Sequence, residues 1–207
     1  MDRSSFDHSL QLPLMEAFYT IQGEGAFSGK PAYFIRLGGC DVGCVWCDVK
    51  DSWDANKWPL TKIESIVEEA AIYQTRLAVI TGGEPFMYNL EGLTEQLKKS
   101  GFQINVETSG AHPYSGQLDW TCLSPKKFKA PLPEWYELAD ELKIIIYNQS
   151  DFKWAEQYAA QMRPDCQLLL QPEWSRQDKM TPYIIEYVKQ HPQWSISLQT
   201  HKYLDIP

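Results

Sequence analysis

The sequence predicts an α/β fold built on a largely parallel sheet that closes, fully or in part, into a barrel. Three observations favour this fold. About seven apolar strand segments alternate with helical segments, the chain has no internal repeats, and clusters of Gly, Pro and polar residues follow the strands at their carboxyl ends. Because such sheets gather their chemistry at those ends, we expect the functional residues there.

Length and charge limit the kind of protein that this chain can be. A chain of 207 residues predicts a single domain over residues 1–207. Its 19 Lys and Arg against 27 Asp and Glu give a net charge of −8, which argues against a protein that binds nucleic acid directly. Apolar runs such as 144–146 are too short to span a membrane, and residues 1–15 contain no apolar signal segment. We therefore expect a cytoplasmic protein without a membrane partner.

An N-terminal arm and one strand lead into a cysteine-rich loop. Residues 1–14 are polar and mixed, and we expect them to form a loosely held arm. The apolar run 32–37 predicts a strand, which Gly38-Gly39 ends. The loop that follows should therefore lie at the carboxyl end of a strand.

The alternation of helices and strands continues to the end of the chain. Thr61 with Glu64 predicts a capping box, since apolar side chains then recur at helical spacing. The other predicted helices and strands follow the same rules of periodicity and turn chemistry, with helices at 90–99, 151–162 and 182–190 and strands at 77–80, 102–106, 120–123, 142–147, 167–170 and 195–198.

Three cysteines in the loop after Gly38-Gly39 form the most informative motif of the chain. Cys40, Cys44 and Cys47 are spaced Cys-x3-Cys-x2-Cys, which suits three corners of an iron–sulfur cube and leaves one iron open. A structural zinc site is the competing interpretation, but such a site normally closes with four ligands, and no fourth Cys or His lies in the loop. Trp46, between two of the cysteines, is expected to shield a cluster from water.

The cysteine motif and a second motif together resemble the radical S-adenosylmethionine (SAM) enzymes. The second motif, Thr81-Gly82-Gly83-Glu84-Pro85, follows the next predicted strand. The resemblance implies a [4Fe-4S] cluster held by Cys40, Cys44 and Cys47, and a SAM molecule on its open iron that yields a 5′-deoxyadenosyl radical. It also implies an electron donor such as flavodoxin or ferredoxin. With about seven strands, we expect an incomplete (β/α) barrel of the radical SAM type.

The rest of the chain is similar to one family of these enzymes, the 7-carboxy-7-deazaguanine synthases. The similarity runs from Glu16 to Pro207, and its segments are Glu16–Gly25, Arg36, Glu107-Thr108, Ser124–Lys126, Gln171-Pro172 and Ser197–Lys202. It implies a lyase that converts 6-carboxy-5,6,7,8-tetrahydropterin to 7-carboxy-7-deazaguanine with loss of ammonia. This step belongs to the biosynthesis of queuosine, a tRNA modification, and of related 7-deazapurines. A homodimer is also implied.

The same resemblance assigns roles to individual residues. It places SAM against Gly83, Ser124, Pro125, Lys126, Gln171, Pro172, Glu173 and Trp174. It places the substrate against Ile21, Gln22, Gly23, Glu24, Arg36, Thr81, Glu107 and Thr108, with His201 and the terminal carboxylate of Pro207 as further candidates. No side chain is assigned to the radical chemistry itself. A guanidinium such as Arg36 suits a carboxylate, and Gln22 and Glu24 match the donor and acceptor edge of a pterin.

One position departs from the pattern of the family. Its members usually place Thr or Ser two residues after the third cysteine, where the hydroxyl helps to hold a Mg²⁺ ion. Here Val49 offers no side-chain oxygen to a hard cation. We expect either a Mg²⁺ held by substrate and water, with help from Asp48, Asp51 or Ser52, or a reduced role for the ion.

Two other functions remain open from the sequence. A glycyl-radical activating enzyme would share the three-cysteine spacing but should lack the pterin-matching segment Glu16–Gly25. A non-enzymatic zinc or iron–sulfur module would recruit a fourth ligand from elsewhere in the chain. Metal content separates them, because a radical enzyme should hold about four irons per chain and a zinc module one zinc.

Overall fold

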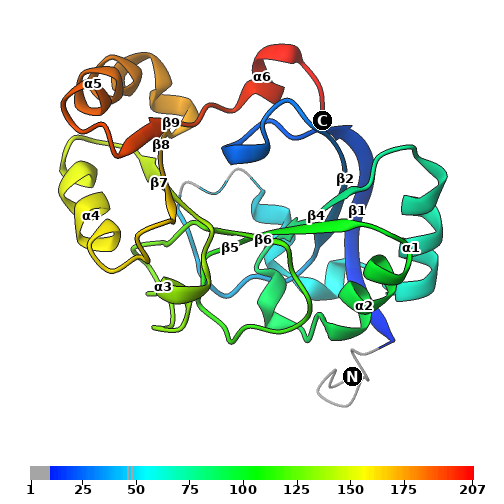
Figure 1. Ribbon diagram of the computed structural model, residues 1–207. Coiled ribbons are helices and arrows are strands. Elements are labelled where there is room, and N and C mark those ends of the chain that lie inside the picture. Colours follow the sequence, from blue (N-terminus) through cyan, green and yellow to red (C-terminus); the bar gives the residue numbers. More distant parts are fainter. Residues whose placement is uncertain (1–9, 46, 48) are drawn as a thin grey trace.

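One twisted sheet of nine strands organises the protein. A computed structural model describes residues 10–45, 47 and 49–207 (Figure 1). In the sheet the strands follow the order β3-β1-β2-β4-β5-β6-β7-β8-β9. Their bounds are β1 (Gln11–Ile21), β2 (Pro31–Leu37), β3 (Leu60–Lys62), β4 (Leu77–Gly82), β5 (Gln103–Thr108), β6 (Trp120–Leu123), β7 (Glu141–Ile146), β8 (Gln167–Pro172) and β9 (Trp194–Ile196).

The sheet is mainly parallel and stays open. From β2 to β9 every neighbouring pair runs parallel, whereas β1 is antiparallel to both β2 and β3. Among the described strands β3 and β9 are the two edges, so the sheet curls without closing. The expected incomplete α/β barrel is confirmed.

Helices cover the outer face of the curled sheet (Figure 1). The α-helices are α1 (Ile63–Ile72), α2 (Glu91–Lys99), α3 (Trp135–Leu138), α4 (Ser150–Ala159), α5 (Gln177–Gln190) and α6 (Thr200–Leu204). Short 3-10 turns are η2 (Gly25–Phe27), η3 (Lys50–Trp53), η4 (Ala55–Lys57), η5 (Pro85–Met87) and η6 (Trp174–Arg176). The described helices are all too short or too polar to cross a membrane.

The core lies between the sheet and these helices. In α1 the buried side chains are Ile63, Ile66, Val67 and Ala70, which share one face of the helix. The strand β4 is buried from Leu77 through Thr81, as expected for a parallel strand covered on both sides. This packing holds the strands in place. Because they run parallel, their carboxyl ends lie along one rim of the sheet.

Two strands at the start of the sheet differ from the prediction. Residues 11–14 belong to β1, where Leu12 is fully buried and pairs with Thr61 of β3. The expectation of a loose arm as far as residue 14 is therefore wrong for these residues, while residues 1–9 lie outside the described part of the chain. The strand β1 escaped prediction because its side chains alternate irregularly between buried and exposed positions.

Two helix starts also differ. The capping box is not formed, because Thr61 belongs to β3 and the N-cap of α1 is Lys62, without a side-chain cap. Helix α5 begins at Gln177, so that Pro182 lies inside the helix instead of at its start. Proline is favoured in the first turn of a helix, and this preference misplaced the predicted start.

Candidate functional site

A cavity of about 290 Å³ lies at the carboxyl ends of the parallel strands. All of the residues predicted to bind the cluster, SAM or the substrate line it, except Pro125. Pro125 lines a neighbouring cavity instead, together with Lys127 and Trp154. The structure also brings Glu84, Ser109, Lys143 and Gln199 to the main cavity, and none of these had been assigned a role from the sequence.

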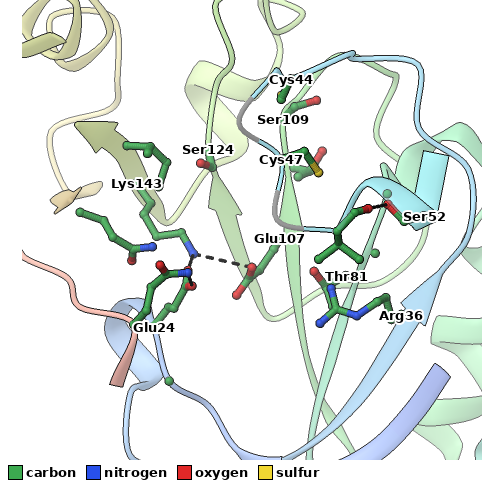
Figure 2. A pocket seen from close by; sticks show the side chains of 18 of the residues that line it. Glu24, Arg36, Cys44, Cys47, Ser52, Thr81, Glu107, Ser109, Ser124 and Lys143 are labelled. Atoms are coloured by element: carbon green, nitrogen blue, oxygen red, sulfur yellow. Dashed lines mark hydrogen bonds and ion pairs between the residues drawn. The ribbon is translucent and has the colours of Figure 1, made fainter. Parts of the chain in front are cut away.

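The cysteine loop forms one wall of this cavity. Cys44 is buried, Cys40 and Cys47 are half-buried, and the three side chains pack with Val42 and Ala111 in one apolar cluster. Backbone bonds from Gly39 and Cys40 to η3 hold the start of the loop. Figure 2 shows Cys44 and Cys47 at the edge of the cavity, beside Ser109. The positions 46 and 48, where a cluster shield and a Mg²⁺ ligand were expected, lie outside the described residues.

The three thiols of the loop fit an iron–sulfur cluster. Burial raises the pKa of Cys44 to about 11, and the neighbouring thiols add to this, although the charge of Lys126 opposes it. Cluster assembly must therefore displace a proton from this thiol. Within the described residues no three Cys, His, Asp or Glu side chains already form a metal-binding group. Three free thiols in one apolar cluster nevertheless suit a cluster with one open iron.

A glycine pair at the end of β4 packs directly against this loop. The backbone nitrogen of Gly83 donates to the Leu37 carbonyl at 2.9 Å, and that of Glu84 donates to the Gly39 carbonyl at 2.8 Å. A Cβ atom on Gly83 would lie 2.1 Å from the Gly39 oxygen and 2.9 Å from Cys40 Cβ. Only glycine allows this close approach.

Gly83→Ala should therefore displace the cysteine loop. We expect the variant to lose most of its reconstituted iron, measured as iron per chain together with the visible absorption of the cluster. Gly29→Ala is the matched control, since a Cβ there meets nothing within 4 Å although φ is +86°. Full iron content in Gly83→Ala would contradict the tight packing of this turn.

Glu84 ties the ends of two strands together beneath the cavity. Its side chain is 1% exposed. One carboxylate oxygen accepts a hydrogen bond from the Thr108 hydroxyl at 2.6 Å, and the other accepts from the Ser109 backbone nitrogen at 2.8 Å and from the Ser109 hydroxyl. The glutamate of the Gly-Gly-Glu sequence thus anchors the end of β5 to the end of β4.

A polar network forms another wall of the cavity. Lys143, on β7, donates to Glu24 and lies 3.6 Å from Glu107. The amide of Gln22 donates to Glu107 at 3.0 Å, and that of Gln199 donates to Glu24 at 2.8 Å. Burial alone would raise the pKa of Glu24, but the charge of Lys143 and the hydrogen bonds from Lys143, Gln199 and Gln171 together outweigh it and lower that pKa to about 2. Figure 2 shows the two glutamates converging on the Lys143 ammonium.

Arg36 lies on a third side of the cavity, apart from this network. It projects from β2 beside Thr81 and Ser52, as Figure 2 shows. Its Nε donates to Glu16 at 2.6 Å, and the side chain is 20% exposed. The ion pair fixes the guanidinium at the cavity, and the parallel pairing of Arg36 with Thr81 places the two strand ends level.

The C-terminal segment runs from β9 back to the end of β1. The backbone nitrogen of Thr200 donates to the Gly23 carbonyl at 2.9 Å, and the Thr20 hydroxyl donates to the Pro207 carbonyl at 3.1 Å. On the other side the Lys202 ammonium lies 5.0 Å from the centre of the Trp174 ring. This segment therefore brings Gln199, His201 and Pro207 to the cavity, where all three line the wall.

Comparisons with known proteins agree with this architecture. A model of the radical SAM superfamily matches residues 34–146. The chain is 57% identical over 196 residues to the 7-carboxy-7-deazaguanine synthase of Flavobacterium psychrophilum, covering 95% of this chain and 93% of that protein. It is 36% identical to the synthase of Escherichia coli K12, covering 95% and 100%.

A solved structure extends the agreement to three dimensions. The crystal structure of QueE from Escherichia coli superposes with a TM-score of 0.84 at 33% identity, and covers 91% of this chain and 93% of its own. The sequence relatives, the superfamily model and the shared fold all point in one direction. The chain belongs to the 7-carboxy-7-deazaguanine synthase family of the radical SAM superfamily.

Proposed function

We propose that the protein converts 6-carboxy-5,6,7,8-tetrahydropterin to 7-carboxy-7-deazaguanine with release of ammonia, as a step toward queuosine. The observation that carries this proposal is the composition of the main cavity, which joins a three-cysteine loop to a guanidinium and a carboxylate–amide wall. Neither a glycyl-radical activating enzyme nor a metal-binding module accounts for that wall.

The cysteine side of the cavity would hold the cofactors. Cys40, Cys44 and Cys47 would hold the [4Fe-4S] cluster, and the turns after β4, β6 and β8 would line SAM through Gly83, Ser124, Lys126, Gln171, Pro172, Glu173 and Trp174. When bound, these groups supply a 5′-deoxyadenosyl radical that abstracts hydrogen from the substrate. The protein's part is to orient the two ligands and to exclude water.

The opposite side would bind the pterin. Arg36 would pair with the substrate carboxylate through charged hydrogen bonds, because its guanidinium is held at the cavity by Glu16. Gln22, Glu24 and Glu107 would accept and donate along the pterin edge. The other lining residues of this side, which shape the pocket around the ring, are Ile21, Gly23, Thr81, Thr108, His201 and Pro207.

The carboxylate contact predicts the effect of Arg36→Lys. Lysine keeps the charge but loses the planar fork, so the affinity for 6-carboxypterin, a stable fluorescent analogue, should fall about 10-fold or more. The absorption of the reconstituted cluster should stay unchanged, because Arg36 lies apart from the cysteine loop. Fluorescence titration of both proteins provides the measurement, and equal affinities would rule out the carboxylate contact.

We also propose that a Mg²⁺ ion binds in the cavity, with ligands that differ from those usual in the family. Val49 and Ser52 both line the cavity, and the Ser52 hydroxyl donates to the Val49 carbonyl at 2.6 Å. Ser52 therefore offers a side-chain oxygen where Val49 offers none. Asp51 is a poorer candidate, since its side chain is 80% exposed and pairs with Lys57. We propose that substrate, water and Ser52 hold the ion.

The remaining features of the proposal concern partners and location. We infer that a flavodoxin or ferredoxin supplies the electron, because reductive cleavage of SAM needs an external one-electron donor. We also propose a homodimer, the commonest arrangement of soluble oligomers, working in the cytoplasm. The net charge of −8 agrees with a small-molecule substrate and no direct contact with nucleic acid.

A further inference from the structure

Lys143 is a buried cation that the sequence did not reveal as part of the site. It projects from β7 into the cavity wall, and its side chain is 3% exposed. Its Nζ donates to Oε2 of Glu24 and lies 3.6 Å from Oε2 of Glu107. One ammonium therefore joins two carboxylates that come from the loop after β1 and from the end of β5 (Figure 2).

Both carboxylates are also fixed at their second oxygen. Gln199 donates to Oε1 of Glu24 at 2.8 Å, and Gln22 donates to Oε1 of Glu107 at 3.0 Å. The side-chain amide oxygen of Gln22 in turn accepts from the Glu24 backbone nitrogen at 3.1 Å, which links the two halves of the network. A carboxylate has about four lone-pair positions, so each glutamate can still accept from a ligand in the cavity.

The charges around Lys143 leave an excess of negative charge at this wall. Besides Glu24 and Glu107, the titratable groups that act on it are Glu141, Cys122 and Lys126. Glu141 is already bound by the Ala26 backbone nitrogen and by the Trp120 indole, and burial raises the pKa of Cys122, which keeps that thiol neutral. Burial lowers the pKa of Lys126.

The balance at Lys143 itself favours its charged form. Burial would lower its pKa, but Glu107 and Glu24 outweigh this and raise it well above the ordinary value. The ammonium consequently stays charged at neutral pH and stabilises the charged form of Glu24. Without it, burial would raise the pKa of Glu24.

We propose that Lys143 is a specificity-determining residue, which keeps Glu24 charged and holds Glu24 and Glu107 in place at the cavity so that both accept hydrogen bonds from the N–H groups of a 2-amino-4-oxopyrimidine ring. This inference rests on the proposed function and names the part of the substrate that the polar wall selects. A protonated glutamate would instead place a donor against the donors of the ligand. The wall should therefore favour an amino group over a keto oxygen at the ring's C2.

Binding of two ring analogues to Lys143→Met tests the proposal. Methionine keeps the length of the side chain and removes its charge. The probes are 6-carboxypterin, with the 2-amino group, and 6-carboxylumazine, with oxygen in its place. The wild type should prefer the pterin and bind it equally at about pH 6 and about pH 7.5, because Glu24 stays charged throughout.

The variant should differ in selectivity and in pH dependence. Without the ammonium the pKa of Glu24 rises, so its carboxylate gains a proton as the pH falls and the pterin then meets a donor. We expect pterin affinity about 10- to 100-fold weaker at the lower pH, partial recovery at the higher pH, and a smaller preference over the lumazine. A lysine that only stabilised the fold would weaken both probes equally at both pH values, and that result would overturn the proposal.

Two further proteins keep the test decisive. Lys127→Met is the matched control, since Lys127 pairs with Asp151 outside the main cavity and should leave both affinities unchanged. If Lys143→Met does not fold, the double variant Lys143→Met with Glu107→Gln removes one carboxylate with the ammonium. It should bind the pterin with reduced selectivity and more weakly at the lower pH, because Glu24 has lost its cation, and full selectivity would overturn the proposal. If the wild type binds neither probe, the proposed function itself fails.

Discussion

Cys44→Ala is expected to abolish cluster assembly and turnover together. Cys44 is the buried member of the three thiols and lies at the centre of the apolar cluster that includes Cys40 and Cys47. Two remaining thiolates cannot hold a [4Fe-4S] cluster with a single open iron. After anaerobic reconstitution, the iron content should fall from about four irons per chain in the wild type to a small residual fraction in the variant. No 5′-deoxyadenosine should form.

The control for this variant is another buried thiol far from the cavity wall. Cys166 is 8% exposed, belongs to the main hydrophobic core and does not line the cavity. Cys166→Ala should therefore keep its iron and its activity, apart from a modest loss of stability. A Cys44→Ala protein that retains the cluster and turns over at the wild-type rate would contradict the assignment of this loop as the cluster site.

Among the variants of cavity residues, Glu84→Ala should lower the free energy of unfolding the most. The substitution leaves the Thr108 hydroxyl, the Ser109 backbone nitrogen and the Ser109 hydroxyl without the acceptor that they share in a buried position. We expect the free energy of unfolding to fall by about 3 kcal/mol or more, measured from the denaturant midpoint.

An exposed glutamate provides the comparison. Glu95 pairs with Lys99 on the surface of α2, so Glu95→Ala should change the free energy of unfolding by no more than about 0.5 kcal/mol. Glu84→Ala should also lower SAM binding, because the turn that contains Gly83 loses its anchor. Equal denaturation midpoints for the two variants would show that the strand ends are held by other contacts.

The sequence predicted which residues line the cavity better than it predicted which of them contact one another. The cysteine loop, Thr81, Glu107, Ser124 and Gln171 could be placed together because parallel strands bring their carboxyl ends to one rim. Lys143 was missed because it stands within the apolar run of β7, and its partner Glu24 lies 119 residues away in the chain. No local sequence pattern predicts an ion pair between residues so far apart in the chain.

The same limit explains which elements of the fold escaped prediction. The strands from β4 to β8 are short apolar runs bounded by turn residues, and propensity identifies them. By contrast, β3 and α6 contain three and five residues and depend on distant partners, namely β1 and the Gly23 loop. Tertiary contacts create these elements, so the local sequence does not indicate them.

Product formation from a defined substrate tests the central claim most directly. The protein would be reconstituted anaerobically with iron and sulfide, then given SAM, a reductant and 6-carboxy-5,6,7,8-tetrahydropterin, with mass spectrometry of the products. The account predicts 7-carboxy-7-deazaguanine in molar excess over the SAM consumed. A cluster-loaded protein that cleaves SAM to 5′-deoxyadenosine and leaves the pterin unchanged would contradict it.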